Sequence, residues 1–327
     1  MAEALLSVRE LKKWFLQEPG FFPSLFNRGR SIAVRAVDGI SFSVSEGEIL
    51  GIAGESGCGK TTTGMTLVKL YEPSGGEIRF RGDDISSFQG KDLKAYRRRA
   101  QIIFQNPYES LNPRMTVLDT VSEPWKIHGE TDKRKREELV ARALERSGLA
   151  PPREFFHRFS HELSGGQRQR VAIARAIVLE PKFLVADEPV SMLDVSIRAG
   201  VLKLLWDFSR KLGMAIVYIS HDLSTIRQIC DRLAIMYLGK IVEIGPTEEV
   251  IQNPAHPYAQ ALIAAVPVPD PESFRPEPQI DMEVPSALDI PSGCRFHPRC
   301  SRRKEDCSQI EPPLQEISPQ HHVACFT

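Results

Sequence analysis

The chain has 327 residues, enough for one large domain or two smaller ones. Its 42 basic residues balance its 42 acidic residues, which argues against a general nucleic-acid coat, because such proteins rely on many basic contacts to phosphates. No apolar stretch approaches the roughly 18 residues of a membrane helix, and the N-terminal sequence MAEALLSVREL lacks the apolar run of a secretory signal. We therefore expect a soluble chain in the cytoplasm.

Apolar patterning along the chain predicts strands and helices in alternation. Strands are expected over 31–44 and 48–54, and residues 17–30, with two prolines and two glycines, are expected to form a loop. Helices are then predicted at about 60–71, 91–99, 117–128, 132–148, 165–179 and 196–212, with strands at 182–187 and 214–219. This alternation indicates an α/β fold with a mostly parallel sheet and helices on its faces. The proline-rich sequence after residue 267 is expected to be a linker or an irregular extension.

The stretch GESGCGKT, from Gly54 to Thr61, directly follows a predicted strand and matches the P-loop pattern G-x-x-x-x-G-K-[ST]. Its glycines let the backbone wrap closely around a polyphosphate, which the backbone N–H groups and the following helix N-terminus attract. Lys60 adds a full charge for the β- and γ-phosphates, and the Thr61 hydroxyl is suited to Mg²⁺. The alternative is a chance glycine-rich turn. Cys58 is interpreted as a small packing residue, with a redox-sensitive thiol as the alternative.

Two carboxylates follow a second buried strand in FLVADEP, residues 183–189. Asp187 is placed to bind the water shell of Mg²⁺, since this hard cation prefers oxygen ligands. Glu188 is placed to orient and polarise an attacking water, because phosphoryl transfer depends mostly on positioning and charge stabilisation. A solvated acidic turn is the alternative, and the P-loop upstream weakens it.

The stretch LSGGQRQR, residues 163–170, is absent from most P-loop proteins. With the two motifs above it resembles the ATP-binding-cassette (ABC) ATPases. The resemblance extends to Gln105 in IIFQNP, to SMLD at 191–194 and to ISHD at 219–222, and it covers about residues 5–250. It implies an ABC nucleotide-binding domain over 1–255, with an antiparallel β subdomain and a helical subdomain at about 106–180.

The family resemblance also implies an ATP and Mg²⁺ site that two cassettes share head to tail. In this chain the implied nucleotide-binding residues are Gly54, Glu55, Ser56, Gly57, Cys58, Gly59, Lys60, Thr61 and Thr62, with Thr61, Gln105 and Asp187 serving Mg²⁺. Glu188, His221, Lys60 and Gln105 are the implied catalytic residues. Ser164, Gly165, Gly166 and Gln167 would serve the γ-phosphate held by the partner, although a serine before a helix is also an ordinary N-cap.

The same resemblance also implies roles at the dimer interface and at the adenine. Asp194 would communicate across the dimer interface, and Met192 stands where alanine is common. The adenine platform falls on Phe15 of LKKWF rather than on Trp14, with an ordinary core position as the alternative for Phe15.

Two further stretches indicate which group of ABC ATPases the chain resembles. QNPYESLNPRMTV (105–117) and NPAHPYAQAL (253–262) resemble the dipeptide/oligopeptide importer ATPases, which include nickel-uptake relatives, and most closely their F-type subunit. The implied partners are two transmembrane permease subunits, a second and related ATPase chain forming a heterodimer and, indirectly, an extracytoplasmic solute-binding protein, with no nucleic acid. Such a subunit lies at the cytoplasmic face of the inner membrane. A soluble cassette ATPase of repair or translation is the alternative, but the chain has one cassette and no long coiled-coil insertion.

Four of the six cysteines lie near the end of the chain, in an extension expected over 256–327. Their spacing is C-x5-C-x6-C-x17-C, through Cys294, Cys300, Cys307 and Cys325. Disulfides are rare in the cytoplasm, so such a cluster points to metal. The importer branch implies a [4Fe–4S] cluster, and zinc is the main alternative. Disulfides and free thiols remain further alternatives, and His297, His321 and His322 are nearby substitutes as ligands.

Overall fold

The computed structural model describes residues 4–17, 32–106, 110–265 and 288–326. The predicted loop after Gln17, residues 107–109 of the stretch QNPYESLNPRMTV and most of the predicted linker lie outside these residues. The described chain forms two compact units. The first takes in Val44–Ile49 and Ser87–Ile219 with the first residues of the chain, and the second takes in Leu6–Ser43, Leu50–Ser86 and the residues from Ser220 onward.

The first unit contains three parallel strands in the order β8-β7-β6. These are β6 (Ala100–Ile103), β7 (Phe183–Asp187) and β8 (Ala215–Ile219). Every residue of β7 and β8 is buried, as expected of parallel strands covered on both faces. The register pairs Ile103 with Ala186, so β6 and β7 end at the same edge. The motifs at the ends of the two strands are therefore neighbours.

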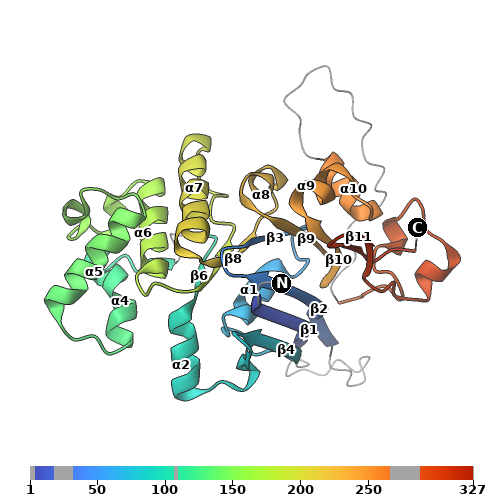
Figure 1. The fold of residues 1–327 in the computed structure, drawn as a ribbon, viewed down its shortest axis with the longest axis horizontal. Coiled ribbons are helices and arrows are strands. Elements are labelled where there is room, and N and C mark those ends of the chain that lie inside the picture. Colours follow the sequence, from blue (N-terminus) through green and yellow to red (C-terminus); the bar gives the residue numbers. More distant parts are fainter. Residues whose placement is uncertain (1–3, 18–31, 107–109, 266–287, 327) are drawn as a thin grey trace, which may run out of the picture. The chain divides into compact units, whose positions relative to one another are not determined.

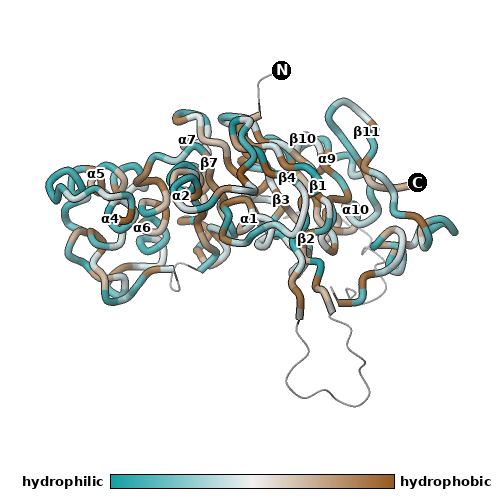
Figure 2. Tube along the Cα trace, turned by 90° about the horizontal axis from the view of Figure 1, so that it is seen from below, coloured by the Kyte–Doolittle hydropathy of each residue, from teal (hydrophilic) through white to brown (hydrophobic). Residues whose placement is uncertain are grey.

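Helices make up the rest of the first unit. They are α2 (Gly90–Arg99), α4 (Val117–Ile127), α5 (Lys133–Arg146), α6 (Gly165–Ile177) and α7 (Val195–Leu212). Helices α4, α5 and α6 pack on one another as a helical group (Figure 1). Asp132 caps α5 by accepting hydrogen bonds from the N–H groups of Arg134 and Lys135. Figure 2 shows α5 largely in teal, in keeping with its charged sequence.

The second unit contains two groups of strands. An antiparallel sheet has the order β2-β1-β4-β5, and a second group has the order β11-β12-β10-β9-β3, in which β3 and β9 are parallel. The strands are β1 (Ala4–Gln17), β2 (Ile32–Ser45), β3 (Ile49–Ala53), β4 (Gly75–Phe80), β5 (Asp83–Asp84), β9 (Arg232–Tyr237), β10 (Lys240–Pro246), β11 (Gln315–Ser318) and β12 (His321–Val323). Helices are α1 (Lys60–Leu67), α8 (Leu223–Ile229), α9 (Thr247–Gln252) and α10 (Pro257–Ala264). The expected α/β fold is confirmed, as is the expected antiparallel β subdomain.

The C-terminal extension, expected to be irregular, also contains a short hairpin. Strand β12 pairs antiparallel with β10, and β11 pairs with β12. A buried carboxylate explains the attachment: Glu243 in β10 lies 2.7 Å from His321 Nε2 and accepts hydrogen bonds from the N–H groups of Ala255 and His256. A buried charge is retained only where several donors satisfy it. Sequence pattern alone could not reveal donors so far from Glu243 along the chain.

His256 begins α10 and is itself buried, at 1% exposure. Its Nδ1 accepts a hydrogen bond from the Tyr258 N–H at 3.0 Å, so the ring caps the helix in its neutral form. Burial lowers the pKa of His256 from 6.5 to about 4, and the charge of Arg302 acts in the same direction.

This lowered pKa predicts acid sensitivity. Between about pH 6.5 and 4 the unfolded chain binds a proton at His256 that the folded chain does not, so the free energy of unfolding falls as pH falls through this window. The effect at the acid end is up to about 3 kcal/mol. A His256→Asn variant keeps an acceptor for the Tyr258 N–H and does not titrate. Urea unfolding at pH 7 and pH 4.5 should show a smaller loss of stability in the variant. Equal losses in the two proteins would contradict the prediction.

Candidate phosphate-binding loop, acidic site and cysteine pocket

The loop between β3 and α1 has the backbone that its sequence predicts. Gly54, Gly57 and Gly59 have φ values of +151°, +80° and +105°, which side chains other than hydrogen resist. A Cβ on Gly54 would lie 2.2 Å from the Met236 carbonyl oxygen, and one on Gly59 would lie 2.0 Å from that of Ala36. A Cβ on Gly57 would meet no atom of the described residues within 4 Å. The loop is therefore packed tightly against β-strand backbone at its ends and open at its middle, where Ser56 is also exposed.

Lys60 lies across this loop. Its Nζ donates hydrogen bonds to the carbonyl oxygens of Gly54 at 2.7 Å and Glu55 at 2.9 Å. Thr61 is exposed and Thr62 half-buried at the start of α1. Cys58 is buried, and burial raises the pKa of its thiol despite the nearby Lys60 charge. A protonated, buried thiol fits the interpretation of Cys58 as a packing residue rather than a redox-sensitive group.

The aromatic residues of β1 are only partly buried. The Phe15 ring lies edge-on to Tyr71 with 5.3 Å between ring centroids, and Lys13 Nζ lies 4.9 Å from the Phe15 centroid. Because Phe15 is half-buried, it is not an ordinary core residue. Its neighbour Trp14 donates from Nε1 to Asp38 Oδ1 at 2.9 Å, which fixes the indole.

In the first unit the structure brings Gln105 and Glu188 together. Gln105 follows β6, Glu188 follows β7, and Gln105 Nε2 donates to Glu188 Oε2 at 3.0 Å. Glu188 has φ +44°, a strained value for a residue with a side chain, and its N–H donates to the Ile219 carbonyl of β8. Asp187, the last residue of β7, is buried at 2% exposure. A strained backbone held by a neighbouring strand is typical of residues positioned for chemistry.

The LSGGQ stretch forms the start of α6. Ser164 is the N-cap and accepts from the Gln167 N–H at 3.3 Å, while Gln167 Oε1 accepts from the Ser164 N–H at 3.0 Å. Ser164 therefore has the structural role of an N-cap, which the sequence analysis gave as the alternative to a phosphate contact. Gly166 allows close packing, because a Cβ there would lie 2.8 Å from Ile197 of α7. Ser164 nevertheless remains exposed, and Gly165 is half-buried.

Asp194 and His221 lie at the starts of helices. Asp194 is the N-cap of α7, and nearby Met192 and Val195 are 57% and 80% exposed. His221 is exposed, between β8 and α8. Lys60, Thr61 and His221 belong to the second unit, whereas Gln105, Asp187 and Glu188 belong to the first.

Sequence reasoning missed residues that surround the phosphate-binding loop from the C-terminal side. Tyr258 accepts a hydrogen bond from the Glu55 N–H at 2.8 Å, and Arg299 pairs with the Glu55 carboxylate at 2.9 Å. Arg295 pairs with Asp38, the partner of Trp14. The signal for these contacts was weak: two arginines four apart, between the first two cysteines of the tail.

The four tail cysteines line one small pocket, together with His256, His297 and Arg302. Burial raises the pKa of Cys294 to about 11 and also raises that of Cys300, with the other tail thiols adding to both shifts. Within the parts of the chain that the structure describes, no three His, Cys, Asp or Glu side chains are grouped closely enough to hold a metal ion. Cys230, by contrast, is buried at the end of α8, as expected of a core residue.

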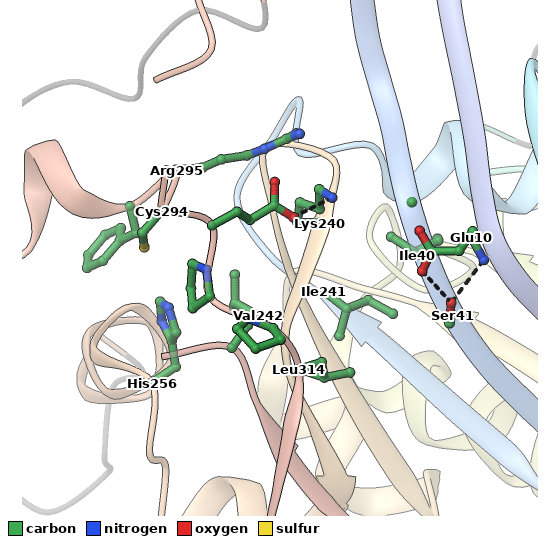
Figure 3. Close-up of a pocket in the computed structure, with 16 residues that line it drawn as sticks. Glu10, Ile40, Ser41, Lys240, Ile241, Val242, His256, Cys294, Arg295 and Leu314 are labelled. Carbon is green, nitrogen blue, oxygen red and sulfur yellow. Dashed lines mark hydrogen bonds and ion pairs between the residues drawn. The ribbon is translucent and has the colours of Figure 1, made fainter. Parts of the chain in front are cut away.

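A larger pocket of about 430 Å³ adjoins the first of these cysteines (Figure 3). Its wall is formed by strands β1, β2 and β10 and by the tail, through residues that include Glu10, Ser41, Lys240, Arg295, Phe296 and Leu314. The polar groups on it pair with one another: Lys240 lies 2.6 Å from Glu311, and Ser41 bonds Glu10. The pocket lies where the tail packs on β1, β2 and β10 within the second unit.

Among the helices of the described residues, none is long and apolar enough to cross a membrane.

Comparison with known proteins identifies the family of the chain. A family model described as "ABC transporter" matches residues 37–191, and one described as "Oligopeptide/dipeptide transporter, C-terminal region" matches residues 242–307. The probable peptide ABC transporter ATP-binding protein y4tS of Sinorhizobium fredii is 44% identical over 99% of this chain and 90% of its own length. The oligopeptide transport ATP-binding protein AppF of Bacillus subtilis is 45% identical over 99% of this chain and 97% of its own.

A solved structure agrees with the fold. The structure of cbiO1 from Clostridium perfringens, described as part of the ABC transporter complex cbiONQ, aligns with a TM-score of 0.63 and 29% identity, covering 76% of this chain and 91% of cbiO1. The first family model spans the glycine loop and the acidic strand end, and the second spans Cys294, Cys300 and Cys307 of the tail. This chain belongs to the ATP-binding proteins of peptide ABC transporters.

Proposed function

We propose that this chain hydrolyses ATP to energise the import of dipeptides and oligopeptides, as a peripheral subunit at the cytoplasmic face of the inner membrane. The observation that carries the proposal is a glutamate with strained backbone, hydrogen-bonded to Gln105, in a chain that also holds a glycine loop shaped for phosphates. The relatives' names and the C-terminal family model support peptides rather than nickel complexes as cargo.

We assign the nucleotide cycle to residues 1–255, including the helical subdomain at about 106–180, and treat 256–327 as the C-terminal extension. The loop from Gly54 to Thr62 fits a polyphosphate, because its glycines exclude a Cβ where backbone approaches and leave its middle open. Lys60 would exchange its bonds to loop carbonyls for phosphate oxygens. Phe15, half-buried, would support the adenine.

The family resemblance would give Mg²⁺ oxygen ligands from Thr61, Asp187 and Gln105. Asp187 is the last residue of β7 and Gln105 follows β6, and these strands end at one edge. The ion neutralises charge on the β- and γ-phosphates when bound. Glu188 accepts the proton of the attacking water, Gln105 orients its carboxylate, and His221 contacts the γ-phosphate and the water.

Completion of the site requires a second cassette. The exposed Ser164 and half-buried Gly165 at the N-terminus of α6 are suited to a γ-phosphate held by that partner. The exposed Met192 and Val195 beside Asp194 fit a surface covered by the same partner. Membrane permease subunits and an ATPase partner are expected from the family. A related chain as that partner, and indirect dependence on a solute-binding protein, are the finer parts of the proposal.

Replacement of Glu188 tests the hydrolytic role. We expect Glu188→Gln to bind ATP with nearly unchanged affinity and to lower kcat at least about 100-fold, because the amide cannot take the proton. Single-turnover hydrolysis and equilibrium binding, with permease and partner present, separate the two effects. Glu180→Gln is the matched control: Glu180 also has positive φ, at +52°, and pairs with Arg146 on the surface. Full turnover in Glu188→Gln would remove Glu188 from the role of base.

For the tail we propose a [4Fe–4S] cluster held by Cys294, Cys300, Cys307 and Cys325. Support comes from the one pocket that all four thiols line. A zinc ion requires all its sulfurs at about 2.3 Å from one centre, whereas each thiolate of a cubane cluster binds a different iron. Thiols with raised pKa must lose protons to the bulk when they become ligands, so loading should become weaker at low pH.

Elemental analysis of anaerobically purified chain tests this assignment. We expect about four irons and four acid-labile sulfides per chain, given a full set of four thiolate ligands, and visible absorption that disappears in a Cys307→Ser variant. A Cys230→Ser variant, altered at a buried cysteine outside the pocket, should retain the iron. One zinc per chain without visible absorption would favour the alternative metal and contradict the cluster.

A further inference from the structure

The segment from Cys294 to Cys300 carries two buried arginines that reach the nucleotide site. Arg299 forms a two-pronged ion pair with the P-loop residue Glu55: Nη1 donates to Oε2 at 2.9 Å and Nη2 to Oε1 at 3.1 Å. The Arg299 side chain is 7% exposed and that of Glu55 is 26% exposed. A fork of this kind fixes the orientation of the carboxylate as well as its position. Cys300 is the next residue after Arg299.

The backbone of Glu55 is hydrogen-bonded as well as its side chain. Its N–H donates to Tyr258 Oη at 2.8 Å, and its carbonyl accepts from Lys60 Nζ and from the Cys58 N–H. Burial lowers the pKa of Arg299, but its bonds to Glu55 and Tyr237 outweigh this and raise the pKa overall. Arg299 therefore remains a fixed positive charge. A shift of the Glu55 backbone would also move an oxygen that anchors Lys60.

The second arginine reaches the other end of the site. Arg295 donates to Asp38 and to the Leu238 carbonyl, and Asp38 accepts from the indole of Trp14, next to Phe15. The Arg295 and Asp38 side chains are 7% and 8% exposed. Burial raises the Asp38 pKa, but the bonds from Arg295 and Trp14 lower it below its usual value, so the carboxylate stays charged.

Between the arginines, Phe296 anchors the segment. Its ring lies 5.4 Å from that of Tyr237 and 5.5 Å from that of Tyr258, centroid to centroid. Tyr258 is the residue that bonds the Glu55 N–H. The aromatic cluster and the two ion pairs thus attach one short segment to the P-loop and to the strand bearing Phe15.

We propose that the Cys294–Cys300 segment is a positioning element for the nucleotide site, in which Arg299 sets the place of Glu55 and thereby of Lys60, and in which disturbance of the cysteine site weakens nucleotide binding. The inference rests on the nucleotide site of the proposed function and goes beyond it by giving the tail a role there. Arg299 is a positioning residue that acts through Glu55.

Binding of MgADP to the full-length chain, measured by calorimetry, tests the role of Arg299. We expect Arg299→Met to weaken binding about tenfold, the scale of one charged hydrogen bond. Arg299→Lys should recover only part of this, because one ammonium cannot match both carboxylate oxygens. Arg303→Met, at an exposed arginine of the same tail, should stay within about twofold of the wild type.

A double-mutant cycle separates positioning from general destabilisation. Glu55→Gln should weaken MgADP binding as Arg299→Met does, and the double variant should be little worse than either, because both remove one interaction. Wild-type affinity in Arg299→Met would overturn the proposal. If that variant does not fold, wild-type affinity in Glu55→Gln overturns it equally. Failure of the unaltered chain to bind MgADP would instead contradict the proposed function.

The link to the cysteine site has its own readout. Cys300→Ser should weaken MgADP binding in the same direction as Arg299→Met. By reciprocity of linked equilibria, saturating MgADP should then increase the fraction of iron that the unaltered chain retains at equilibrium with a chelator. Unchanged MgADP affinity in Cys300→Ser, with iron lost, would show that the segment keeps its place without the cysteine site and would overturn this link.

Discussion

The proposed nucleotide site depends on the close approach of the loop backbone to the backbone of neighbouring strands, with no side chain between them. Gly54 and Gly59 have positive φ and lie so close to the carbonyls of Met236 and Ala36 that a single added carbon would displace the loop. Such closeness fixes where the loop begins and ends, and leaves its middle to face a ligand. Lys60 and Glu55 then act from defined positions. The strands against which the loop packs therefore determine where its backbone donors and Lys60 lie.

Elements that local pattern determines could be predicted from the sequence. The apolar runs 48–54 and 182–187 form β3 and β7, because a short, continuous apolar run suits a parallel strand that is covered on both faces. Each run ends in the residues that bear chemistry, so the P-loop and Glu188 could be placed from their strands. Predicted helices recur within a few residues, although α1 ends at Leu67 rather than near residue 71. Lys69 has φ +58°, which ends the helix where apolar periodicity alone would continue it.

Local pattern could not predict contacts whose partners lie far along the chain. Arg299 and Glu55 are 244 positions apart, and Glu243 meets His321 across 78 positions. No local sequence pattern links an arginine in the tail with a glutamate in the P-loop, and both residue types are usually found on the surface. Ser164 shows a different limit. Its sequence context allowed a phosphate contact and a helix cap, and the cap exists without removing the hydroxyl from the surface.

The tail shows why distant charges and clustered thiols belong together. Within residues 288–326 the buried apolar side chains are Phe296, Cys307, Pro312 and Val323, too few to order such a segment by hydrophobic burial alone. Buried ion pairs such as Arg295–Asp38 fix the orientation of the segment but contribute little net free energy of folding, since both charges lose water. The free energy of metal coordination would be large enough to order such a segment. As we propose, coordination at the cysteines orders the tail and its arginines set the direction in which it packs. Nucleotide affinity would then depend on whether the cysteines hold their cluster.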